Sequence, residues 1–464
     1  MSTRGESGNE SSNCKPYSRS STGIGAANTR RSMSSMSTTS LSLSQPMNTF
    51  DINKPAVILD IGTELTKIGL AGDLSPRVII RTEYIDEQLV LQKDVFSGVD
   101  EKDRSSLSRL LRFFKHIYYN HLLTMPRERR VVIVESLLCP TRLRRAISTV
   151  LLDLLESPSV LFAPSHLLAT FPFNTNTALV IDMGYKETVI IPVAEGITML
   201  SQWEAGNKGA RAIIARLRQL LEKEGQVEDL DGSRRPLSKA DWHVIEETRL
   251  LEDVLVRGLV VSSMSRADLI RSGQSPSPPT APLILPMATD MLIVPGKIRE
   301  EAAEIVFEST SPDDPGLHEM IHSIVERVTL FFSFTPFLST VLLTIPTVPL
   351  QCPIDLRKRL FSRILPIGGV SLIPGLLSRL KAEIVRLAEN RGLKTCDEVG
   401  FFTFQKAQME PWMAWLGGSM LGSLTDTLQH RSVSREDWIQ RRVLPDATDF
   451  IDPFDRKTNG KTRA

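Results

Sequence analysis

Two apolar runs separated by a short polar stretch mark the first structured part of the chain. Residues 57–59 (VIL) are apolar enough for a buried strand, and residues 68–72 (IGLAG) form a second run. The stretch between them, DIGTELTK, contains an Asp-x-Gly turn. Such turns are common in tight β-hairpins, so this one alone leaves open whether it only reverses the chain or also holds a phosphate.

The same strand–turn–strand pattern returns further along the chain. Residues 178–196 (ALVIDMGYKETVIIPVAEG) again place an Asp-x-Gly turn between two apolar runs. Between the two copies, the spacing of apolar residues predicts helices at 107–123 and 140–155 and strands at 131–134 and 160–162. This alternation predicts an α/β fold. Two copies of one unit suggest two related domains facing a cleft, with both turns pointing backbone N–H groups at a bound anion.

The ends of the chain differ in composition from the rest. The first 50 residues hold 14 serines and almost no clustered apolar residues, so they cannot bury enough surface to offset the entropy of ordering. We expect residues 1–54 to be a disordered tail open to phosphorylation, and residues 451–464 to be a second disordered tail. No apolar core of a secretory signal is present in the tail. A mitochondrial transit peptide is the alternative, although the Gly-rich middle disfavours an amphipathic helix.

Charge and cysteine content narrow the classes of partner and compartment. Lys and Arg total 55 against 54 acidic residues, so no net field draws the protein to nucleic acid or to anionic lipid. The four cysteines are scattered without CxxC spacing, which argues against a zinc site and against a disulfide framework. We therefore expect a protein of a reducing compartment with no nucleic-acid partner.

One internal segment stands apart. Residues 328–351 carry no charged side chain over 24 positions, which makes the segment a candidate membrane span. Three prolines and seven Ser/Thr residues argue against a stable membrane helix. Two other interpretations remain open. The segment is either a genuine apolar insertion, which would mark a partner site if exposed, or a translated intron end, because its residue types have pyrimidine-rich codons.

Four segments, in order, carry a resemblance to the actin family. The first turn, with GLAGD at 69–73 and Pro76-Arg77, resembles the first phosphate loop of that family, and residues 178–196 resemble the second. Residues 352–384 (CPIDLRKRLFSRILPIGGVSLIPGLLSRLKAEI) are similar to its adenosine segment, and 415–424 (WLGGSMLGSL) to its C-terminal helix. Each match is short, but the order of all four is specific, and together they cover most of residues 55–440.

The resemblance implies the actin-like fold, shared with Hsp70 and the sugar kinases, with two related domains around a nucleotide cleft. It assigns residues 55–172 to the first large domain, to which 413–450 return. Residues 173–412 form the second, with 328–351 as an insertion. The chain between Pro76-Arg77 and the FFKHIYYNHLL helix is shorter than in actin, so we expect a shortened subdomain 2.

The resemblance also implies a site for ATP with Mg²⁺. In the family, the hairpin lysine and the neighbouring N–H groups bind the phosphates, the two aspartates hold Mg²⁺ through water, and a glycine pair lets the backbone approach the base. The matching positions are Asp60, Gly62, Thr63, Lys67, Asp182, Gly184, Gly368 and Gly369, with Asp60 and Asp182 as the metal-holding pair. For Gly368 and Gly369, a plain strand-to-helix turn is an equally good interpretation.

Several positions depart from the family pattern. Glu64 adds a carboxylate to the first turn, which would cost roughly 3 kcal/mol about 5 Å from a phosphate unless the side chain turns outward. Residues 185–187 (YKE) make the second turn bulky. Leu255-Val256 replace the charged pair at the rim of the adenine site. We expect nucleotide binding to be retained or weakened.

Hydrolysis needs a group that orients the attacking water. The glutamine with this role in the family corresponds to Ser165, and the assisting histidine to Val189. His166 lies next to Ser165, but a histidine that opens an apolar helix is usually a structural or capping residue. We therefore expect little or no ATP hydrolysis.

Finer features resemble the actin-related subunit of the pointed-end complex of dynactin. They are DMGYKE at 182–187 and the pattern CPIDLRK…GG-x-S-x-x-PG at 352–375. The Pro-rich loop 272–282 in the pointed-end half adds to the difference from actin. A subunit with one altered face would cap a filament and not extend it. The implied partners are the actin-like filament and other pointed-end subunits, and indirectly dynein and microtubules, in the cytoplasmic cytoskeleton. A chromatin-associated actin-related protein and an active ATPase or sugar-kinase relative are the alternatives.

Overall fold

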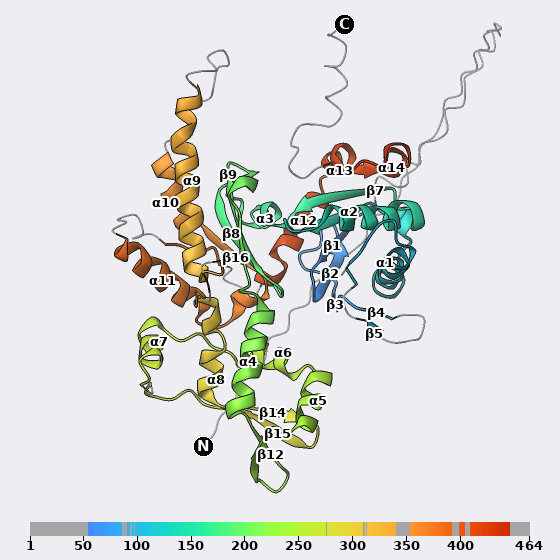
Figure 1. Ribbon diagram of the computed structural model, residues 1–464. Helices are drawn as coiled ribbons and strands as arrows, with labels where there is room; N and C mark the ends of the chain where they lie inside the picture. Colours follow the sequence, from blue (N-terminus) through green and yellow to red (C-terminus); the bar gives the residue numbers. More distant parts are fainter. Residues whose placement is uncertain are drawn as a thin grey trace, which may run out of the picture. The chain divides into compact units, whose positions relative to one another are not determined.

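Most of the chain between residues 54 and 445 is described by the computed structural model shown in Figure 1. The described residues are 54–85, 91–92, 95–96, 98–274, 276–309, 311, 313–339, 353–391, 399–403 and 409–445. The expected tails, apart from Lys54, lie outside these residues. The described part mixes parallel and antiparallel sheets with many helices, which confirms the predicted α/β class.

The first sheet has six strands in the order β17-β7-β6-β1-β2-β3. Their bounds are β1 Val57–Ile61, β2 Leu65–Leu70, β3 Val78–Arg81, β6 Val131–Glu135, β7 Ser159–Pro164 and β17 Val433–Ser434. Strand β1 pairs antiparallel with β2 and parallel with β6, which itself pairs parallel with β7. All five residues of β6 are buried, as expected of a strand covered on both faces. The strands predicted at 57–59, 131–134 and 160–162 are confirmed.

The second sheet repeats this local plan. Its main path is β10-β9-β8-β16, and β11 also pairs with β9. The bounds are β8 Ala178–Met183, β9 Thr188–Ala194, β10 Ile197–Thr198, β11 Glu204–Gly206 and β16 Ile364–Ile367. Strand β8 pairs antiparallel with β9 and parallel with β16. Each sheet is therefore centred on a hairpin whose first strand also has a parallel neighbour.

Helices around the first sheet lie where the apolar spacing predicts them. The predicted helix at 107–123 is α1 Arg104–His116 followed by a π-helical turn, η1 Ile117–Leu122. The predicted helix at 140–155 is α2 Thr141–Ser148 followed by another π-helical turn, η3 Thr149–Leu154. The remaining elements of this part are β4 Tyr84–Ile85, β5 Leu91–Gln92, η2 Pro126–Glu128, α3 Ser165–Leu168 and η4 Phe171–Phe173.

The chain returns to the first sheet near its end. Helix α12 Met413–Gly422 packs against β1, β6 and α3. The fully buried Trp415 donates its indole N–H to the carbonyl of Ile58 at 3.2 Å. A Cβ at Gly417 would lie 1.9 Å from the carbonyl oxygen of Leu168, so only glycine permits this approach. Elements η8 Glu410–Trp412, α13 Thr425–Arg431 and α14 Arg435–Arg441 flank the helix.

The second sheet is joined to a further group of helices and a four-stranded sheet, β13-β12-β15-β14 (Figure 1). The strands are β12 Gln226–Glu228, β13 Arg234–Pro236, β14 Leu283–Met287 and β15 Asp290–Val294. The helices up to the apolar segment are η5 Leu200–Gln202, α4 Ala210–Glu224, α5 Lys239–Glu247, α6 Leu250–Gly258, α7 Met264–Arg271, α8 Gly296–Glu301 and η6 Glu304–Val306. One continuous hydrophobic core joins this group to the second sheet.

Helix α9 Leu317–Ser339 includes the first half of the apolar segment 328–351. Val328 is buried in the core of the second sheet, whereas residues 340–351 lie outside the described part. The chain continues with α10 Pro353–Phe361, η7 Gly369–Leu372 and α11 Leu376–Asn390. Within the described residues, no helix has the length and apolar character needed to cross a membrane. That the segment is an insertion stays a prediction.

Candidate functional site

The first turn joins a carboxylate to an ammonium group. Asp60 and Lys67 are cross-strand partners in the β1–β2 register, and the Lys67 Nζ donates to the Asp60 Oδ2 at 2.6 Å. Both side chains are largely buried, with 15% and 18% of their surface exposed. The Gly62 N–H closes the turn by donating to the Leu65 carbonyl at 3.1 Å, whereas Thr63 is exposed. The hairpin register therefore fixes the Asp60–Lys67 pair directly below the turn.

The second turn closes in the same way but lacks the lysine. The Gly184 N–H donates to the Glu187 carbonyl at 3.1 Å. Asp182 pairs in register with Val189, so a valine stands where the first hairpin has Lys67. The carbonyl of Gly184 accepts from the N–H of Ala210, the first residue of α4. The first residue of helix α4 is thus hydrogen-bonded to the second turn.

The acidic groups of the two turns act on one another. Burial raises the pKa of Asp182 to about 6. Lys67 opposes this rise in the Asp182 pKa, and Asp60 and Glu187 add to it. Asp60, Lys67 and Asp182 are therefore close enough to form one electrostatic group. Two carboxylates and an ammonium at the ends of two hairpins suit a phosphate with a hard divalent cation, because Mg²⁺ prefers oxygen ligands and keeps several waters.

Gly368 brings a third segment against the second turn. Strand β16 runs parallel to β8, with Ile367 beside Asp182. Gly368 follows with φ +89°, and a Cβ there would lie 2.3 Å from the Met183 carbonyl oxygen and 3.0 Å from the Asp182 Oδ1. Gly369 opens η7, and its Cβ would meet no atom within 4 Å. Of the two glycines, only Gly368 is needed for close packing.

Two features of the turns differ from simple expectation. Glu64 is turned toward two arginines, and its carboxylate accepts from Arg81 at 2.7 Å and from Arg249 at 3.1 Å. Burial raises the pKa of Glu64, Glu252 adds to the rise, and both arginines oppose it. Tyr185, expected to crowd a phosphate, packs its partly buried ring against the hydrophobic core of the second sheet. Lys186 is exposed, with its Nζ 4.0 Å from Glu187.

Ser165 and His166 are buried and hydrogen-bond to each other. The Ser165 hydroxyl lies 3.1 Å from the His166 Nδ1, and the His166 Nε2 lies 3.4 Å from the Val189 carbonyl oxygen. Because a carbonyl only accepts, Nε2 carries the proton and Nδ1 accepts from the serine. Burial lowers the pKa of His166 to about 4, so the imidazole is neutral at physiological pH. Its hydrogen bonds are those of a structural histidine.

Sequence reasoning missed the partners of Glu64, which include Arg81 and Arg249. No local motif marks them, because Arg249 lies 185 positions from Glu64 and meets it only in the folded chain. The rim positions Leu255 and Val256 lie on α6. Leu255 packs against the core, and Val256 is exposed.

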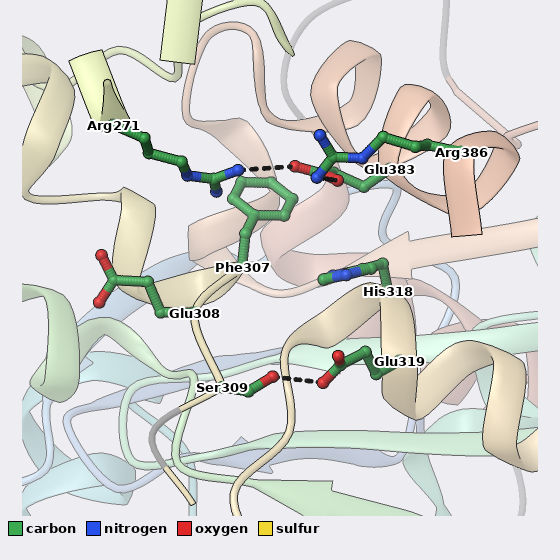
Figure 2. Close-up of a pocket in the computed structure, with 8 residues that line it drawn as sticks. All are labelled: Arg271, Phe307, Glu308, Ser309, His318, Glu319, Glu383 and Arg386. Atoms are coloured by element: carbon green, nitrogen blue, oxygen red, sulfur yellow. Dashed lines mark hydrogen bonds and ion pairs between the residues drawn. The ribbon is translucent and has the colours of Figure 1, made fainter. Parts of the chain in front are cut away.

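A cavity of about 620 Å³ has no residue of either turn in its lining (Figure 2). It is lined by Arg271, Phe307, Glu308, Ser309, His318, Glu319, Glu383 and Arg386. Its charged groups largely satisfy one another, since Arg386 pairs with Glu383 at 2.6 Å and the Ser309 hydroxyl donates to Glu319. Over the described part of the chain, no group of three or more His, Cys, Asp or Glu residues is arranged to hold a metal ion.

Comparison with known proteins identifies relatives over most of the chain. The family model named Actin matches residues 105–442. "Actin-related protein 10" of Dictyostelium discoideum is 23% identical, covering 88% of this chain and 90% of that protein. "Putative actin-29" of the same organism is 18% identical, over 83% of this chain and 94% of that protein. "SWI/SNF and RSC complexes subunit arp42" of Schizosaccharomyces pombe is 23% identical, over 83% and 95%.

Proposed function

The chain belongs to the actin family and has its actin-like α/β fold, and from this premise we propose that it is a non-polymerising actin-related subunit that caps the pointed end of a dynactin-type filament. Through that complex it would support dynein-dependent transport along microtubules, in the cytoplasm and on the cytoskeleton. Its direct partners would be actin-like filament subunits and the other pointed-end subunits.

The observation that carries this proposal is an asymmetry between two regions of the molecule. Helix α12, which resembles the C-terminal helix of the family, is packed against the first sheet through the buried Trp415, and this supports a retained barbed-end half. Between β3 and α1, by contrast, the described residues form only the two-stranded β4–β5 sheet. Head-to-tail assembly propagates only when both faces match, so a subunit with one reduced face ends a filament.

Two other functions compete with this proposal. The relative from Schizosaccharomyces pombe is named as a subunit of SWI/SNF and RSC complexes, which favours a chromatin-associated role. The motif at 182–187 and the similarity to actin-related protein 10 favour the dynactin-type role instead. An active ATPase is the third candidate, and Ser165 and Val189 argue against it.

The cleft residues fit an ATP with Mg²⁺. Asp182 is an acid whose ionised form is disfavoured by burial, and a divalent cation beside it would stabilise that form. Asp60 and Asp182 would hold the ion through water. Lys67, Thr63 and the turns at Gly62 and Gly184 would face the phosphates, with the N–H groups of these two glycines already donating within their own turns. The backbone at Gly368 and Gly369 would face the base. When bound, the ion would neutralise phosphate charge.

Bound ATP should stay unhydrolysed for long periods. Ser165 is too short to orient a water and already donates to His166, and Val189 supplies no polar side chain. We expect phosphate release from the purified protein to be indistinguishable from a nucleotide-only control over hours. Steady phosphate release that disappears in Asp182→Ala would contradict this expectation. Ser165→Gln alone should not restore full activity, because Val189 would remain.

Assembly gives the direct test of the capping role. The purified protein with ATP and Mg²⁺ should stay in the supernatant on ultracentrifugation, and it should block elongation at the pointed ends of preformed actin-like filaments. Filaments formed by this protein alone would contradict the proposed non-polymerising role. Affinity purification from cells separates the two structural roles. Dynactin subunits should co-purify with it, and recovery of chromatin-remodelling subunits in their place would support the alternative.

A further inference from the structure

Four charged side chains surround the carboxylate of Glu64. Together with Glu64 we call them the Glu64 clamp: Glu64, Arg81, Glu83, Arg249 and Glu252. Glu64 is the last residue of the first turn, just before β2, Arg81 ends β3, and Glu83 lies two residues beyond it. Arg249 and Glu252 come from the start of α6, far away in sequence. The clamp therefore joins the first phosphate turn to a helix whose neighbours belong to the core of the second sheet.

Each arginine of the clamp contacts two carboxylates at once. Each arginine donates one nitrogen to Glu64, Arg81 at 2.7 Å and Arg249 at 3.1 Å. The second nitrogen of each arginine donates to a carboxylate of the other segment, so that the contacts cross between β3 and α6. Arg81 of β3 donates to Glu252 of α6 at 2.6 Å, and Arg249 donates to Glu83. Neither guanidinium can leave Glu64 without also disturbing its second partner.

The backbone around the clamp is fixed as well. The backbone of Arg249 adopts the left-handed conformation, with φ 54°, which residues other than glycine rarely take. Its side chain is only 16% exposed. On the other side, the Thr82 N–H donates to the Glu64 carbonyl at 2.9 Å, and the Thr82 hydroxyl donates to the Gly62 carbonyl at 2.8 Å. The direction of the Glu64 side chain is thus set from both sides.

We propose that Arg249 and Arg81 are positioning residues of the first phosphate turn, which hold the Glu64 carboxylate away from the anion that the turn binds. This inference rests on the proposed nucleotide binding. A carboxylate so close to a phosphate turn repels the ligand unless its charge is directed elsewhere and neutralised. Here the guanidinium groups of Arg81 and Arg249 both direct the Glu64 carboxylate and neutralise its charge. The extra acid of the first turn is thereby made compatible with a phosphate ligand by a helix from the other half of the molecule.

Charge rescue tests the proposal. Arg249→Ala should weaken the binding of a fluorescent ATP analogue, with Mg²⁺, by about tenfold at low salt, and less at high salt. Glu64→Gln should bind at least as tightly as the unmodified protein, and the double variant should recover the affinity of Glu64→Gln. Arg257→Ala is the matched control, since Arg257 lies on the same helix and pairs there with Asp253. A double variant that binds no better than Arg249→Ala would overturn the proposal.

A second measurement needs no nucleotide. Amide hydrogen exchange over residues 61–66 should be faster in Arg249→Ala than in the unmodified protein, and unchanged in Arg257→Ala. If the unmodified protein binds no ATP but exchange is still faster in Arg249→Ala, the proposed nucleotide binding is wrong and the positioning of the first turn by the clamp is supported. Equal exchange rates in the unmodified protein and in Arg249→Ala would reject the clamp, whatever the binding result.

Discussion

Replacing Gly368 with alanine should destabilise the protein by about 2 to 4 kcal/mol and remove measurable ATP binding. The backbone at Gly368 has φ +89°, and the new methyl group would lie 2.3 Å from the Met183 carbonyl oxygen. Strand β16 and the second turn must move apart to accept it. Because the Asp182 Oδ1 would also lie only 3.0 Å from the new methyl group, the same movement displaces a proposed Mg²⁺-holding carboxylate. Urea unfolding and ATP-analogue titration measure the two effects.

The neighbouring glycine supplies the control for this substitution. A Cβ at Gly369 meets nothing within 4 Å, so Gly369→Ala should change the free energy of unfolding by less than about 1 kcal/mol and leave ATP binding intact. Equal losses in the two variants would mean that the substitutions act through a general loosening of the turn. Tolerance of alanine at Gly368 would show that the close approach to Met183 is not needed.

Replacing Asp182 with asparagine should abolish Mg²⁺-dependent ATP binding and yet stabilise the nucleotide-free protein at pH 7.5 by about 1 to 2 kcal/mol. Burial raises the pKa of this carboxyl from 3.8 to about 6. In the unfolded chain the group ionises at a lower pH, so between about pH 4 and 6 the unfolded state binds fewer protons and the folded state becomes relatively less stable. Asparagine cannot ionise, so it avoids this cost and removes one of the two carboxylates that would hold the ion through water.

The pH dependence checks the sign of that prediction. The stability advantage of Asp182→Asn should be near zero at pH 4, grow as the pH rises to 6, and stay constant above that. Thermal unfolding of both proteins across this range, without nucleotide, measures it. In the unmodified protein, binding of ATP with Mg²⁺ should weaken below pH 6, because protons compete with the cation for Asp182. An advantage that grows as the pH falls would contradict the assignment of the raised pKa to Asp182.

The hydrophobic pattern predicted the buried strands well, but it placed one strand too late. Strand β2 begins at Leu65, whereas the apolar run begins at 68. The missing residues include Thr66 and Lys67, which are polar but paired inside the sheet, Thr66 with Thr82 at 2.9 Å and Lys67 with Asp60. A method that reads only apolar residues cannot recognise a strand residue whose polarity is satisfied by a partner still unknown.

Within the candidate site, the residues on the two hairpins were predictable from local sequence and their environments were not. The Asp-x-Gly turns identify Asp60 and Asp182, because turn chemistry depends on a few adjacent residues. The pKa of Asp182 depends on its burial in the folded chain and on Lys67 and Asp60 of the other hairpin, and the direction of Glu64 depends on Arg249, which lies 185 positions away. Nothing within a short window of sequence carries this information.

By itself, the sequence determined the α/β class, the two strand–turn–strand units and the residues that end each hairpin, because hydrophobic period and turn preference act between near neighbours. Only the tertiary structure decided three further features of the molecule. Gly368 is required and Gly369 is not, His166 is held in a structural role, and Glu64 is bound by arginines from two separate elements. These features arise from contacts between segments distant in sequence, whose geometry exists only once the sheets and helices have packed.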